Sequence, residues 1–555
     1  MGKRFWLQFY PPGIPHDIDV QAFAAVRHIL ETSCRRFADR PAYSNLGHTL
    51  TYAELERLSR AFGAFLQQRL GLQKGDRLAI MLPNVLQYPV ALFGAFQAGL
   101  TVVNVNPLYT ARELEYQLKD SGAAAIVVLV NFAHTLQEAL PQTQIRTVIT
   151  TQLGDLLPTL RRCLVNFVVR RIRKLVPAWR IDGALAFRDT LKAGRHLPLD
   201  VVPLSHDDIA FLQYTGGTTG LPKGAMLTHG NMVANLQQAS AWLSQDLTEG
   251  GETVITPLPL YHIFSLTANG LTFMKIGGHN ILITNPRDLP ALVRELSRVR
   301  FSVIIGVNTL FNALLNTPGF AQLDFRALKV CLGGGMAVHR AVAERWRQVT
   351  GKPLIEAYGL TECAPGVCIN PLSSTEYSGS VGLPMPATEV SICDDLDHEV
   401  PLGTVGEICV RGPQVMKGYW NRPEETAAAL SPDGWLRTGD LGVMDERGYV
   451  RITDRKKDMI NVSGFNVYPN EVEDVAATHP GVLEVGAVGV PDERSGEVVK
   501  LFVVRRDPSL TAADLIEHCR ARLTGYKVPK YVEFRAELPK TPIGKVLRRA
   551  LRDRA

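Results

Sequence analysis

The stretch Tyr214-Thr-Gly-Gly-Thr-Thr-Gly-Leu-Pro-Lys-Gly-Ala225 gathers three threonines, four glycines and a lysine within twelve residues. Glycines let a backbone approach a ligand closely, while hydroxyls, amide N–H groups and the Lys223 ammonium can all hold phosphate oxygens. The apolar run at 209–212 predicts a strand entering this loop, and residues 231–242 predict a helix after it. A flexible Gly/Thr linker would rarely combine these features, so the pattern favours a phosphate-binding loop.

This loop differs from the P-loop, which reads Gly-x-x-x-x-Gly-Lys-Ser/Thr and leads directly into a helix. Here Gly224 follows the lysine, and Ala225 stands where a magnesium-binding hydroxyl would be expected. We therefore expect a nucleotide to be held by a different architecture, completed by residues from elsewhere in the chain.

The size of the chain and its composition narrow the class of protein. A chain of 555 residues is too long for one hydrophobic core and should form two or more domains. Its hydrophobic content of 46% and charged content of 21% are typical of globular proteins. The net charge of +6 is small for this length, and no zinc-finger or RNA-binding signature appears, so nothing suggests a nucleic-acid partner.

Cysteine spacing and the N-terminus predict a cytoplasmic protein. The eight cysteines are scattered without any Cys-x-x-Cys pair, which favours reduced thiols over a disulfide framework or a zinc site. Residues 1–12 lack the apolar core of a signal peptide, and the longest apolar stretch, 123–130, is too short to span a bilayer. We expect a soluble or at most peripheral protein.

Strand-like and helical patterns alternate along most of the chain. Thr51 and Glu54 form a capping-box pattern that predicts a helix from there to about residue 70. Further helices are predicted at 86–98 and 111–121, and strands at 78–82, 101–105, 125–130, 253–256, 280–283, 302–305 and 329–332. This alternation indicates an α/β fold of mainly parallel sheets covered by helices.

The last third of the chain changes character twice. Residues 380–440 are rich in glycine, proline and short strand-like runs, which predicts a small barrel-like subdomain. After Asp454, strands at 485–490 and 498–504 and a helix at 512–523 predict a compact α+β unit. The charged turn Asp454-Arg-Lys-Lys457 lies between them, so we predict two domains, 1–453 and 454–555, with a hinge near Lys457.

Residues 156–199 interrupt the alternation with an unusually basic segment. Arginines and lysines at 161, 162, 170, 171, 173 and 174 interleave with apolar residues that fall mostly on one half of a helical wheel. Two interpretations stay open: a basic surface helix that packs its apolar face on its own domain, which we favour, and contact with anionic lipid.

Four further motifs lie along the chain. They are Tyr358-Gly-Leu-Thr-Glu362, Thr438-Gly-Asp440, the run from Asp454 to Pro469, and Pro539-Lys-Thr-Pro-Ile-Gly-Lys545. Each is a weak signal alone, but together with the glycine loop, and in this order, they resemble the adenylate-forming superfamily over nearly the whole chain. That superfamily includes acyl-CoA synthetases, firefly luciferases and the adenylation domains of peptide synthetases.

The resemblance narrows to bacterial long-chain fatty acid–CoA ligases. It rests on Asn104-Val-Asn-Pro-Leu-Tyr109, Leu258-Pro-Leu-Tyr-His-Ile-Phe264, Trp435-Leu-Arg-Thr-Gly-Asp-Leu441 and the run 306–315. It implies conversion of ATP, a fatty acid and CoA to acyl-CoA, AMP and diphosphate through an acyl-adenylate, feeding β-oxidation. It also implies peripheral contact at the cytoplasmic face of the inner membrane and, because relatives are often dimers, a homodimer.

Two kinds of alternative remain. An enzyme of the same chemistry could act on medium-chain or aryl acids, or could use a carrier-protein thiol. A non-catalytic sensor of fatty acid or nucleotide would need to have lost the phosphate loop, Glu362 or Lys545, and all three are present.

The resemblance also assigns nucleotide and metal contacts. Asp440 would accept hydrogen bonds from the ribose hydroxyls, with Arg455 supporting ribose or phosphate. Thr218 and Glu362 would hold Mg²⁺, an ion that prefers oxygen ligands. Thr361, which precedes Glu362 in the same motif, would be a catalytic residue. The phosphates and the adenine would be bordered by Tyr214, Thr215, Gly216, Gly217, Thr218, Thr219, Gly220, Lys223, Gly334, Tyr358 and Gly359.

Four residues would act at the reacting end or on the CoA side. Lys545 would offset the negative charge that develops on the carboxylate and α-phosphate. His262 would be a wall of the acyl site without an acid–base role, although a lone histidine in an apolar setting is often a core residue. Lys457 would be the hinge, and Gly464 would line a pantetheine tunnel unless it is an ordinary loop glycine.

Overall fold

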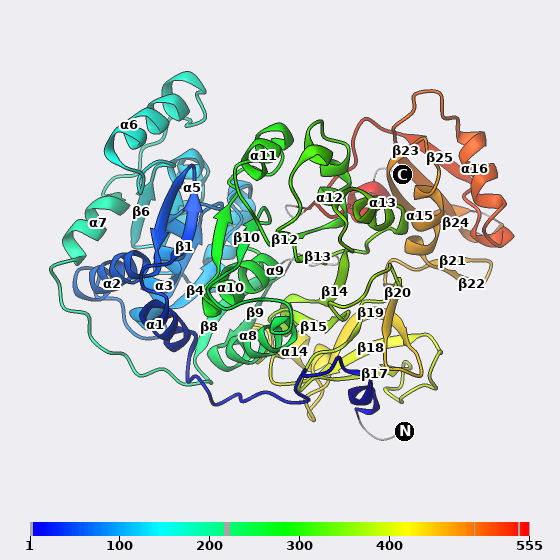
Figure 1. Ribbon diagram of the computed structural model, residues 1–555, viewed down its shortest axis with the longest axis horizontal. Coiled ribbons are helices and arrows are strands. Elements are labelled where there is room, and N and C mark those ends of the chain that lie inside the picture. Colours follow the sequence, from blue (N-terminus) through cyan, green and yellow to red (C-terminus); the bar gives the residue numbers. More distant parts are fainter. Residues whose placement is uncertain (1–3, 216–221, 493, 542–543, 554–555) are drawn as a thin grey trace.

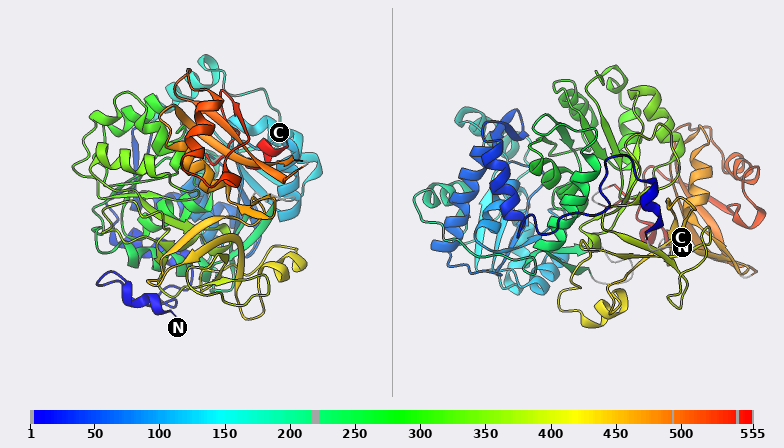
Figure 2. Two further views of the ribbon diagram at one scale, coloured as in Figure 1. Left: turned by 90° about the vertical axis from the view of Figure 1, so that its right-hand side faces the viewer. Right: turned by 60° about the horizontal axis from the view of Figure 1, so that its bottom comes forward.

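The computed structural model describes residues 4–215, 222–492, 494–541 and 544–553 (Figure 1). Two large sheets that are mostly parallel, with helices packed against them, form the body of the molecule, which confirms the predicted α/β fold. A smaller antiparallel sheet follows, and a compact α+β unit forms one end of the molecule. Figure 2 shows this C-terminal unit from two further directions.

The first large sheet has seven strands and carries the glycine loop. Its strand order is β7 (Leu185–Ala186), β6 (Thr147–Thr151), β5 (Ala125–Leu129), β3 (Arg77–Met81), β4 (Thr101–Asn104), β8 (Ile209–Thr215) and β9 (Lys223–Thr228). All neighbouring strands are parallel except β8 and β9, which form an antiparallel pair on either side of the loop. Buried strands of this kind read as continuous apolar runs, which is why the sequence located β3, β4 and β5 to within a residue or two.

The second large sheet has nine strands. Its order is β16 (Leu383–Pro384), β15 (Gly366–Ile369), β14 (Ile355–Gly359), β13 (Val330–Gly333), β12 (Val303–Gly306), β10 (Thr253–Thr256), β11 (His279–Leu282), β1 (Pro41–Asn45) and β2 (His48–Thr51). The central strands from β14 to β1 are parallel, so their carboxyl ends share one edge of the sheet.

The region predicted to be barrel-like contains a four-stranded antiparallel sheet. Its strands are β17 (Glu389–Cys393), β18 (Gly406–Arg411), β19 (Leu436–Met444) and β20 (Val450–Arg455), in that order. The predicted span 380–440 stopped short of β20, and β17 and β20 lie at opposite edges. Among the described strands this sheet is therefore open rather than closed into a barrel.

The C-terminal unit is built on a five-stranded sheet. Its strands are β21 (Ile460–Val462), β22 (Phe465–Val467), β23 (Val482–Asp492), β24 (Gly496–Arg505) and β25 (Tyr531–Phe534). Its own buried core includes Leu501, Leu515 and Cys519. The chain passes from β20 of the previous sheet to β21 of this one across residues 456–459. The predicted boundary between residues 453 and 454 falls within β20, and the predicted hinge residue Lys457 lies in this connection.

Helices cover the sheets and mostly begin where the sequence indicated. Thr51 and Glu54 form both hydrogen bonds of the predicted capping box at the start of α2, a feature that typically contributes about 1 kcal/mol. The α-helices are α1 (Val26–Arg36), α2 (Tyr52–Gln68), α3 (Gln87–Gln97), α4 (Ala111–Ser121), α5 (Ala133–Ala139), α6 (Thr159–Phe167), α7 (Phe187–Gly194), α8 (His229–Leu243), α9 (Ile263–Ser265), α10 (Thr272–Lys275), α11 (Leu289–Leu296), α12 (Asn308–Leu315), α13 (Arg340–Thr350), α14 (Pro423–Ala429), α15 (Pro469–Ala477), α16 (Ala512–Arg520) and α17 (Arg548–Arg552).

Short helices of other types complete the chain. The π-helices are η4 (Val168–Ile172) and η5 (Leu266–Leu271), and the 3₁₀ helices are η1 (Phe5–Phe9), η2 (Val130–Phe132), η3 (Leu140–Gln142), η6 (Phe320–Gln322), η7 (Thr361–Cys363) and η8 (Gly525–Lys527). All eight cysteines are free thiols, and Cys163 on α6 is the exposed one. Of the helices that the described ranges contain, none combines the length and the apolar character needed to span a bilayer.

Candidate active site

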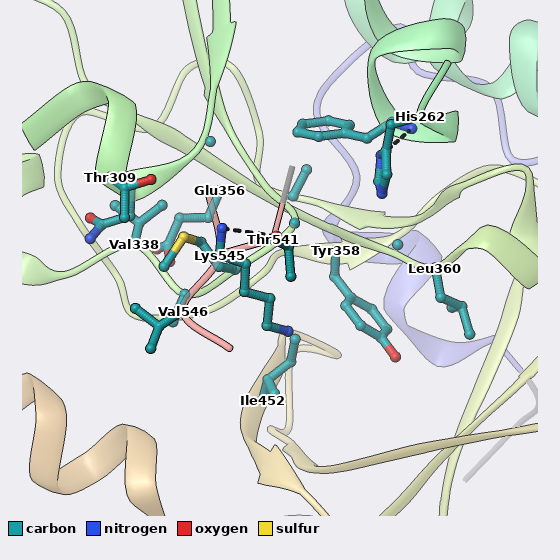
Figure 3. A pocket seen from close by; sticks show the side chains of 18 of the residues that line it. His262, Thr309, Val338, Glu356, Tyr358, Leu360, Ile452, Thr541, Lys545 and Val546 are labelled. Carbon is teal, nitrogen blue, oxygen red and sulfur yellow. Dashed lines mark hydrogen bonds between the residues drawn. The ribbon is translucent and has the colours of Figure 1, made fainter. Parts of the chain in front are cut away.

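A cavity of about 1760 Å³ lies where the large sheets, the antiparallel sheet and the C-terminal unit meet. It is lined by residues at or just beyond the carboxyl ends of β4, β8, β12, β13 and β14, which is where open α/β sheets usually bind ligands. Figure 3 shows that Lys545 from the C-terminal unit enters the same space as Tyr358 and His262 from the body. Residues more than 280 positions apart in the sequence thus share one cavity.

The two ends of the glycine loop line this cavity. Thr215 closes β8 opposite Lys223 at the start of β9, and both side chains face the cavity. Tyr214 is buried, and its hydroxyl donates to Asp120 Oδ2 at 2.7 Å. The loop residues between them that the sequence assigned to phosphate or metal lie outside the described residues: Gly216, Gly217, Thr218, Thr219 and Gly220.

Glu362 is connected to Lys223 through a tyrosine that sequence reasoning missed. The Tyr419 hydroxyl donates to Glu362 Oε1 at 2.7 Å, and Lys223 Nζ lies 5.0 Å from the centroid of the Tyr419 ring. Burial and the adjacent Glu362 carboxylate raise the pKa of Tyr419 well above its usual range, so it stays a donor. Glu362 and Thr361 lie on η7 and line the cavity. The Tyr419 hydroxyl bonds to one oxygen of the Glu362 carboxylate, Oε1. A carboxylate in this polar position fits Mg²⁺, which is commonly bound by one or two carboxylates plus phosphate oxygens.

Two glycines are required by close packing on one side of the cavity. A Cβ on Gly359 would lie 2.2 Å from the carbonyl oxygen of Pro365, which no side chain tolerates. A Cβ on Gly334 would lie 2.9 Å from the Phe264 ring and 3.2 Å from the Ala357 carbonyl oxygen. Glycine at 359 therefore keeps the wall next to Tyr358 thin. Gly334 itself is not among the residues that line the cavity, whereas its neighbours Gly333 and Gly335 are.

Asp440 joins β19 to β14 and to the hinge region. Its Oδ2 accepts a 2.7 Å hydrogen bond from the Tyr358 hydroxyl, and its Oδ1 lies 3.3 Å from Arg455 Nε. The carboxylate is 8% exposed, and Arg455 ends β20, which pairs with β19 in register with Asp440. Tyr358, Asp440 and Arg455 were all predicted to contact the nucleoside, and the fold brings them together.

Lys545 is a half-buried cation that lines the cavity. Burial and then the positive charge of Arg455 lower the pKa of its ammonium to about 8, while Asp440 opposes that shift. Its backbone N–H donates to Thr541 Oγ1 at 3.1 Å, and the preceding carbonyl, of Gly544, accepts a 3.0 Å hydrogen bond from Thr309 on α12. The side chain extends into the cavity beside Tyr358 and Ile452 (Figure 3).

His262 lines the same cavity. Burial lowers the pKa of its imidazole to about 4, so the ring is neutral at physiological pH. Its Nδ1 accepts a hydrogen bond from the Phe264 backbone N–H at 3.3 Å, which caps α9. His262 thus borders the cavity as a neutral ring. Many apolar residues line the same cavity, including Ala239, Leu243, Phe264, Ala268, Phe273, Val303, Val330, Leu332, Ile369 and Met385.

Lys457, which was assigned to the hinge, lies at the cavity, whereas Gly464, which was assigned to the CoA side, does not. Lys457 lines the cavity, and burial followed by the charge of Arg455 lowers the pKa of its ammonium. Gly464 lies in the turn between β21 and β22 and is not among the residues that line the cavity. Its φ of +86° favours glycine, but a Cβ there would meet no atom within 4 Å. In this arrangement Gly464 is a loop glycine away from the site.

A charged cluster around Arg548 also lines the cavity, and it was missed although Asp454 opens one of the motifs. Arg548 donates to both oxygens of Glu473 at 3.0 and 2.7 Å and to Asp454 Oδ1 at 2.8 Å. Burial of the guanidinium would lower the pKa of Arg548. The nearby acids outweigh that effect and hold the pKa above its usual range. Glu356 also lines the cavity, where burial and then the charge of Asp474 raise the pKa of its carboxyl to about 8. The sequence alone favours a solvated face for Arg548, with contact to CoA phosphates as the alternative, because nothing local reveals acids 75 to 94 residues away.

Comparisons with known proteins agree with this geometry. The family model described as AMP-binding enzyme matches residues 30–420, and the model described as AMP-binding enzyme C-terminal domain matches residues 471–545. A long-chain-fatty-acid–CoA ligase of Escherichia coli O6:H1 is 58% identical over 553 residues, covering 100% of this chain and 98% of that protein. That of Haemophilus influenzae is 51% identical over 554 residues, covering 99% and 98%.

A solved structure shows the same architecture. The structure of ATP-bound MatB from Rhodopseudomonas palustris has a TM-score of 0.81 and 28% identity, and covers 95% of this chain and 98% of that one. Three findings lead to one assignment. Family models match most of the chain, relatives are more than half identical over the full length, and a solved structure shares the architecture. This chain belongs to the AMP-binding enzyme family.

Proposed function

We propose that this protein is an AMP-forming long-chain fatty acid–CoA ligase, which uses ATP, Mg²⁺ and CoA and feeds fatty acid β-oxidation. The observation that carries the proposal is the joining of polar and apolar halves in one cavity. Lys545, Asp440 and Glu362 line this cavity together with His262 and with many apolar residues, such as Leu243, Phe264 and Phe273. The long-chain-fatty-acid–CoA ligases that match the whole chain support the same activity.

In the first half-reaction, an oxygen of the fatty carboxylate attacks the α-phosphorus of ATP, and diphosphate leaves. Tyr358 and Asp440 orient the nucleoside, while Thr215, Lys223 and the loop between them hold the outer phosphates. The Lys545 ammonium offsets charge on the carboxylate and the α-phosphate as the new bond forms. Glu362, oriented by Tyr419, and Thr218 would hold Mg²⁺, which neutralises phosphate charge when bound.

In the second half-reaction, the CoA thiol attacks the acyl carbonyl carbon, the thiol proton is lost, and AMP leaves with the electrons of the acyl–phosphate bond. We propose that residues 454–555 rotate as a domain about Lys457 between the two steps. This motion would withdraw Lys545 and bring the turn at Gly464 to the pantetheine path. The open space around Gly464 in the present arrangement is compatible with a role that begins only after rotation.

Release of diphosphate from ATP, measured over saturated acids of graded length with and without CoA, tests the activity. The proposal predicts that long-chain acids give the highest kcat/KM, and that CoA converts slow adenylate formation to sustained turnover. A preference for aryl or medium-chain acids would contradict the proposed substrate class. Turnover with a carrier protein but not with CoA would contradict CoA as the acyl acceptor. No diphosphate release with any acid would favour a sensor.

The cellular setting is part of the proposal. We propose peripheral contact with the cytoplasmic face of the inner membrane, where long-chain acids enter the cell. The homodimer implied by the family resemblance stays a prediction, which light scattering of the purified protein checks.

A further inference from the structure

Helix α6 and the π-helix η4 that continues it form an outlying segment with no buried residue. Figure 1 shows α6 standing away from the sheets, at the end of the molecule opposite the C-terminal unit. Its apolar side chains are unusually open to solvent, with Leu160 89%, Leu164 63% and Phe167 56% exposed. Isolated exposed apolar residues are normal on a protein surface, but a row of them is not.

The exposed apolar residues lie on one face. Leu160, Cys163, Leu164 and Phe167 follow the i, i+3, i+4, i+7 spacing that aligns side chains along a helix. Ile172 and Leu175, which are 63% and 57% exposed, extend the apolar surface beyond α6. We call these six residues the α6 stripe.

The other side of the segment holds it to the body. Val165 packs against the main core, and Asn166 Oδ1 accepts a 2.8 Å hydrogen bond from the Gly154 backbone N–H. Beyond η4, Asn131 donates to the Leu175 carbonyl at 2.9 Å. The interpretation favoured from the sequence, in which the apolar face packs on its own domain, is therefore wrong for the stripe: the packed face is a different one.

Basic residues surround the stripe without acidic partners. Residues 156–181 contain seven arginines and lysines and neither aspartate nor glutamate. Within the described ranges, no ion pair involves Arg161, Arg162, Arg170, Arg171, Arg173 or Lys174. Elsewhere in the molecule surface arginines commonly have a carboxylate within reach, as Arg437 has Asp397. Arg161 donates to the Gly47 carbonyl at 2.6 Å, but no carboxylate neutralises its charge. An apolar stripe flanked by cations of this kind is complementary to a lipid surface with anionic headgroups outside and acyl chains below.

We propose that the α6 stripe and its flanking basic residues dock this protein onto a bilayer of anionic phospholipid. The helix would lie in the plane of the interface, with Leu160, Leu164 and Phe167 among the upper acyl chains and the guanidinium groups at the phosphates. Docking at this end leaves the C-terminal unit at the other end free to rotate (Figure 1). This inference rests on the peripheral membrane contact proposed above and assigns it a surface.

Cys163 provides a direct probe, because it lies in the stripe and the other seven cysteines are buried. The full-length protein, labelled there with an environment-sensitive fluorophore, is mixed with vesicles of phosphatidylglycerol and phosphatidylcholine, or of phosphatidylcholine alone. The proposal predicts a blue shift with the anionic vesicles and a much smaller one without anionic lipid. Raising the salt from about 0.1 to about 0.5 M should weaken the binding.

Unlabelled variants test the two components by co-sedimentation with the same vesicles. Replacing the stripe (Leu160→Ser, Leu164→Ser, Phe167→Ser) or reversing charge (Arg170→Glu, Arg173→Glu, Lys174→Glu) should each lower the partition coefficient at least ~10-fold. Leu396→Ser, at a site 74% exposed in the turn after β17, and Arg298→Glu are matched controls that should partition as the wild type does. Acyl-CoA formation from albumin-bound oleate, without vesicles, should be unchanged in every variant.

The other outcomes contradict the proposal in distinguishable ways. If the stripe and charge variants partition like the wild type, the α6 stripe is not the docking surface, although the protein still binds the membrane. If the wild type itself does not partition, both the surface and the membrane contact fail, while the ligase assay still reports on the enzyme. If light scattering shows a wild-type dimer that the stripe variant dissociates, the stripe is covered by a second copy instead.

Discussion

Lys545 combines two properties that determine how its chemistry depends on pH. It is the cation closest to the reacting groups in the proposed mechanism, and its pKa is lowered to about 8, chiefly by burial. The protonated form predominates below that pH and is lost above it. Because kcat/KM reports ionisations of the free enzyme, the adenylation kcat/KM should fall about tenfold per pH unit above 8.

The variant Lys545→Arg tests this assignment, because a guanidinium stays charged at all accessible pH values. Its kcat/KM should be lower throughout, since the geometry differs, but the decline above pH 8 should disappear. The measurement is diphosphate release with subsaturating acid from pH 6 to 10. An alkaline limb that persists unchanged in the arginine variant would assign the ionisation to another group.

Tyr419 is predicted to act through Glu362 rather than on the substrate. Tyr419→Phe removes the 2.7 Å hydrogen bond to the Glu362 carboxylate and keeps the ring near Lys223. Groups that orient a metal ligand typically change metal affinity about 10–100-fold. We therefore expect the Mg²⁺ concentration at half-maximal adenylation to rise by about that factor, whereas Tyr449→Phe, in the turn before β20, should leave it unchanged. A fall in rate without any shift in the Mg²⁺ dependence would exclude the orienting role.

For individual residues, the sequence located those that belong to motifs but not the side chains that these residues contact in the fold. Tyr358, Asp440 and Lys545 could be predicted because each belongs to a recognisable short motif. Tyr419, Glu356 and Arg548 could not, because each acquires its role from a residue brought close only by the fold. The residues at 216–220 were assigned as well, and that assignment stays a prediction.

Among the secondary-structure elements, β14 and the turn after it set the shape of the cavity wall at Tyr358 and Gly359. Gly359 ends β14 where the chain returns at Pro365, and a Cβ there would lie 2.2 Å from that carbonyl oxygen. Gly359→Ala should destabilise the protein by roughly 1–3 kcal/mol through overpacking and also raise the KM for ATP. Gly525→Ala is the matched control, because its Cβ would meet open space and its φ is ordinary. Thermal unfolding compares the two, and equal melting temperatures would contradict the packing argument.

Helices α12 and α13 hold the C-terminal unit in its present orientation. Asn312 donates to the Leu483 carbonyl at 3.0 Å, Thr309 donates to the Gly544 carbonyl, and His339 pairs with Asp474 on α15. Burial alone would lower the pKa of His339. The hydrogen bond and the charge of Asp474 outweigh burial and raise this pKa, while the smaller contributions of Glu473 and Arg548 oppose each other. Protonation of His339 therefore favours this orientation at acidic pH, and the advantage is lost as the pH rises through the raised pKa.

The variant Asp474→Asn should slow adenylation modestly. Asp474 is partly exposed, so its pair with His339 contributes little, within about 1 kcal/mol. Below pH 6 we expect adenylation to fall about 2–5-fold, with thioester formation from supplied acyl-adenylate unchanged, and the difference should fade at higher pH. Equal effects on both half-reactions would contradict a role in holding one orientation.

The elements themselves were largely predictable, for identifiable reasons. Continuous apolar runs located the buried strands, and the Thr51–Glu54 capping box marked the first residue of α2. The antiparallel sheet β17–β20 was read as barrel-like because alternation and glycine content do not distinguish an open sheet from a closed one. For α6 the pattern revealed an amphipathic helix, but only the fold decides which face meets the body.

For the whole molecule, the sequence indicated two units and a boundary but not how they meet. The contacts between them use backbone carbonyls of Leu483 and Gly544, groups that every residue carries and no motif marks. In the present arrangement Lys545 occupies the cavity and Gly464 lies away from it. In the mechanism that we propose, this arrangement serves the first half-reaction and a large motion precedes the second.

The central claim is that one chain alternates between two such arrangements, so each half-reaction should depend on a different residue. The most direct measurement compares Lys545→Ala and Gly464→Leu in both half-reactions, by diphosphate release and by thioester formation from supplied oleoyl-adenylate. We predict that Lys545→Ala slows adenylation at least ~100-fold and leaves thioester formation near the wild-type rate, and that Gly464→Leu does the reverse. Loss of both half-reactions to the same extent in either variant would contradict the account.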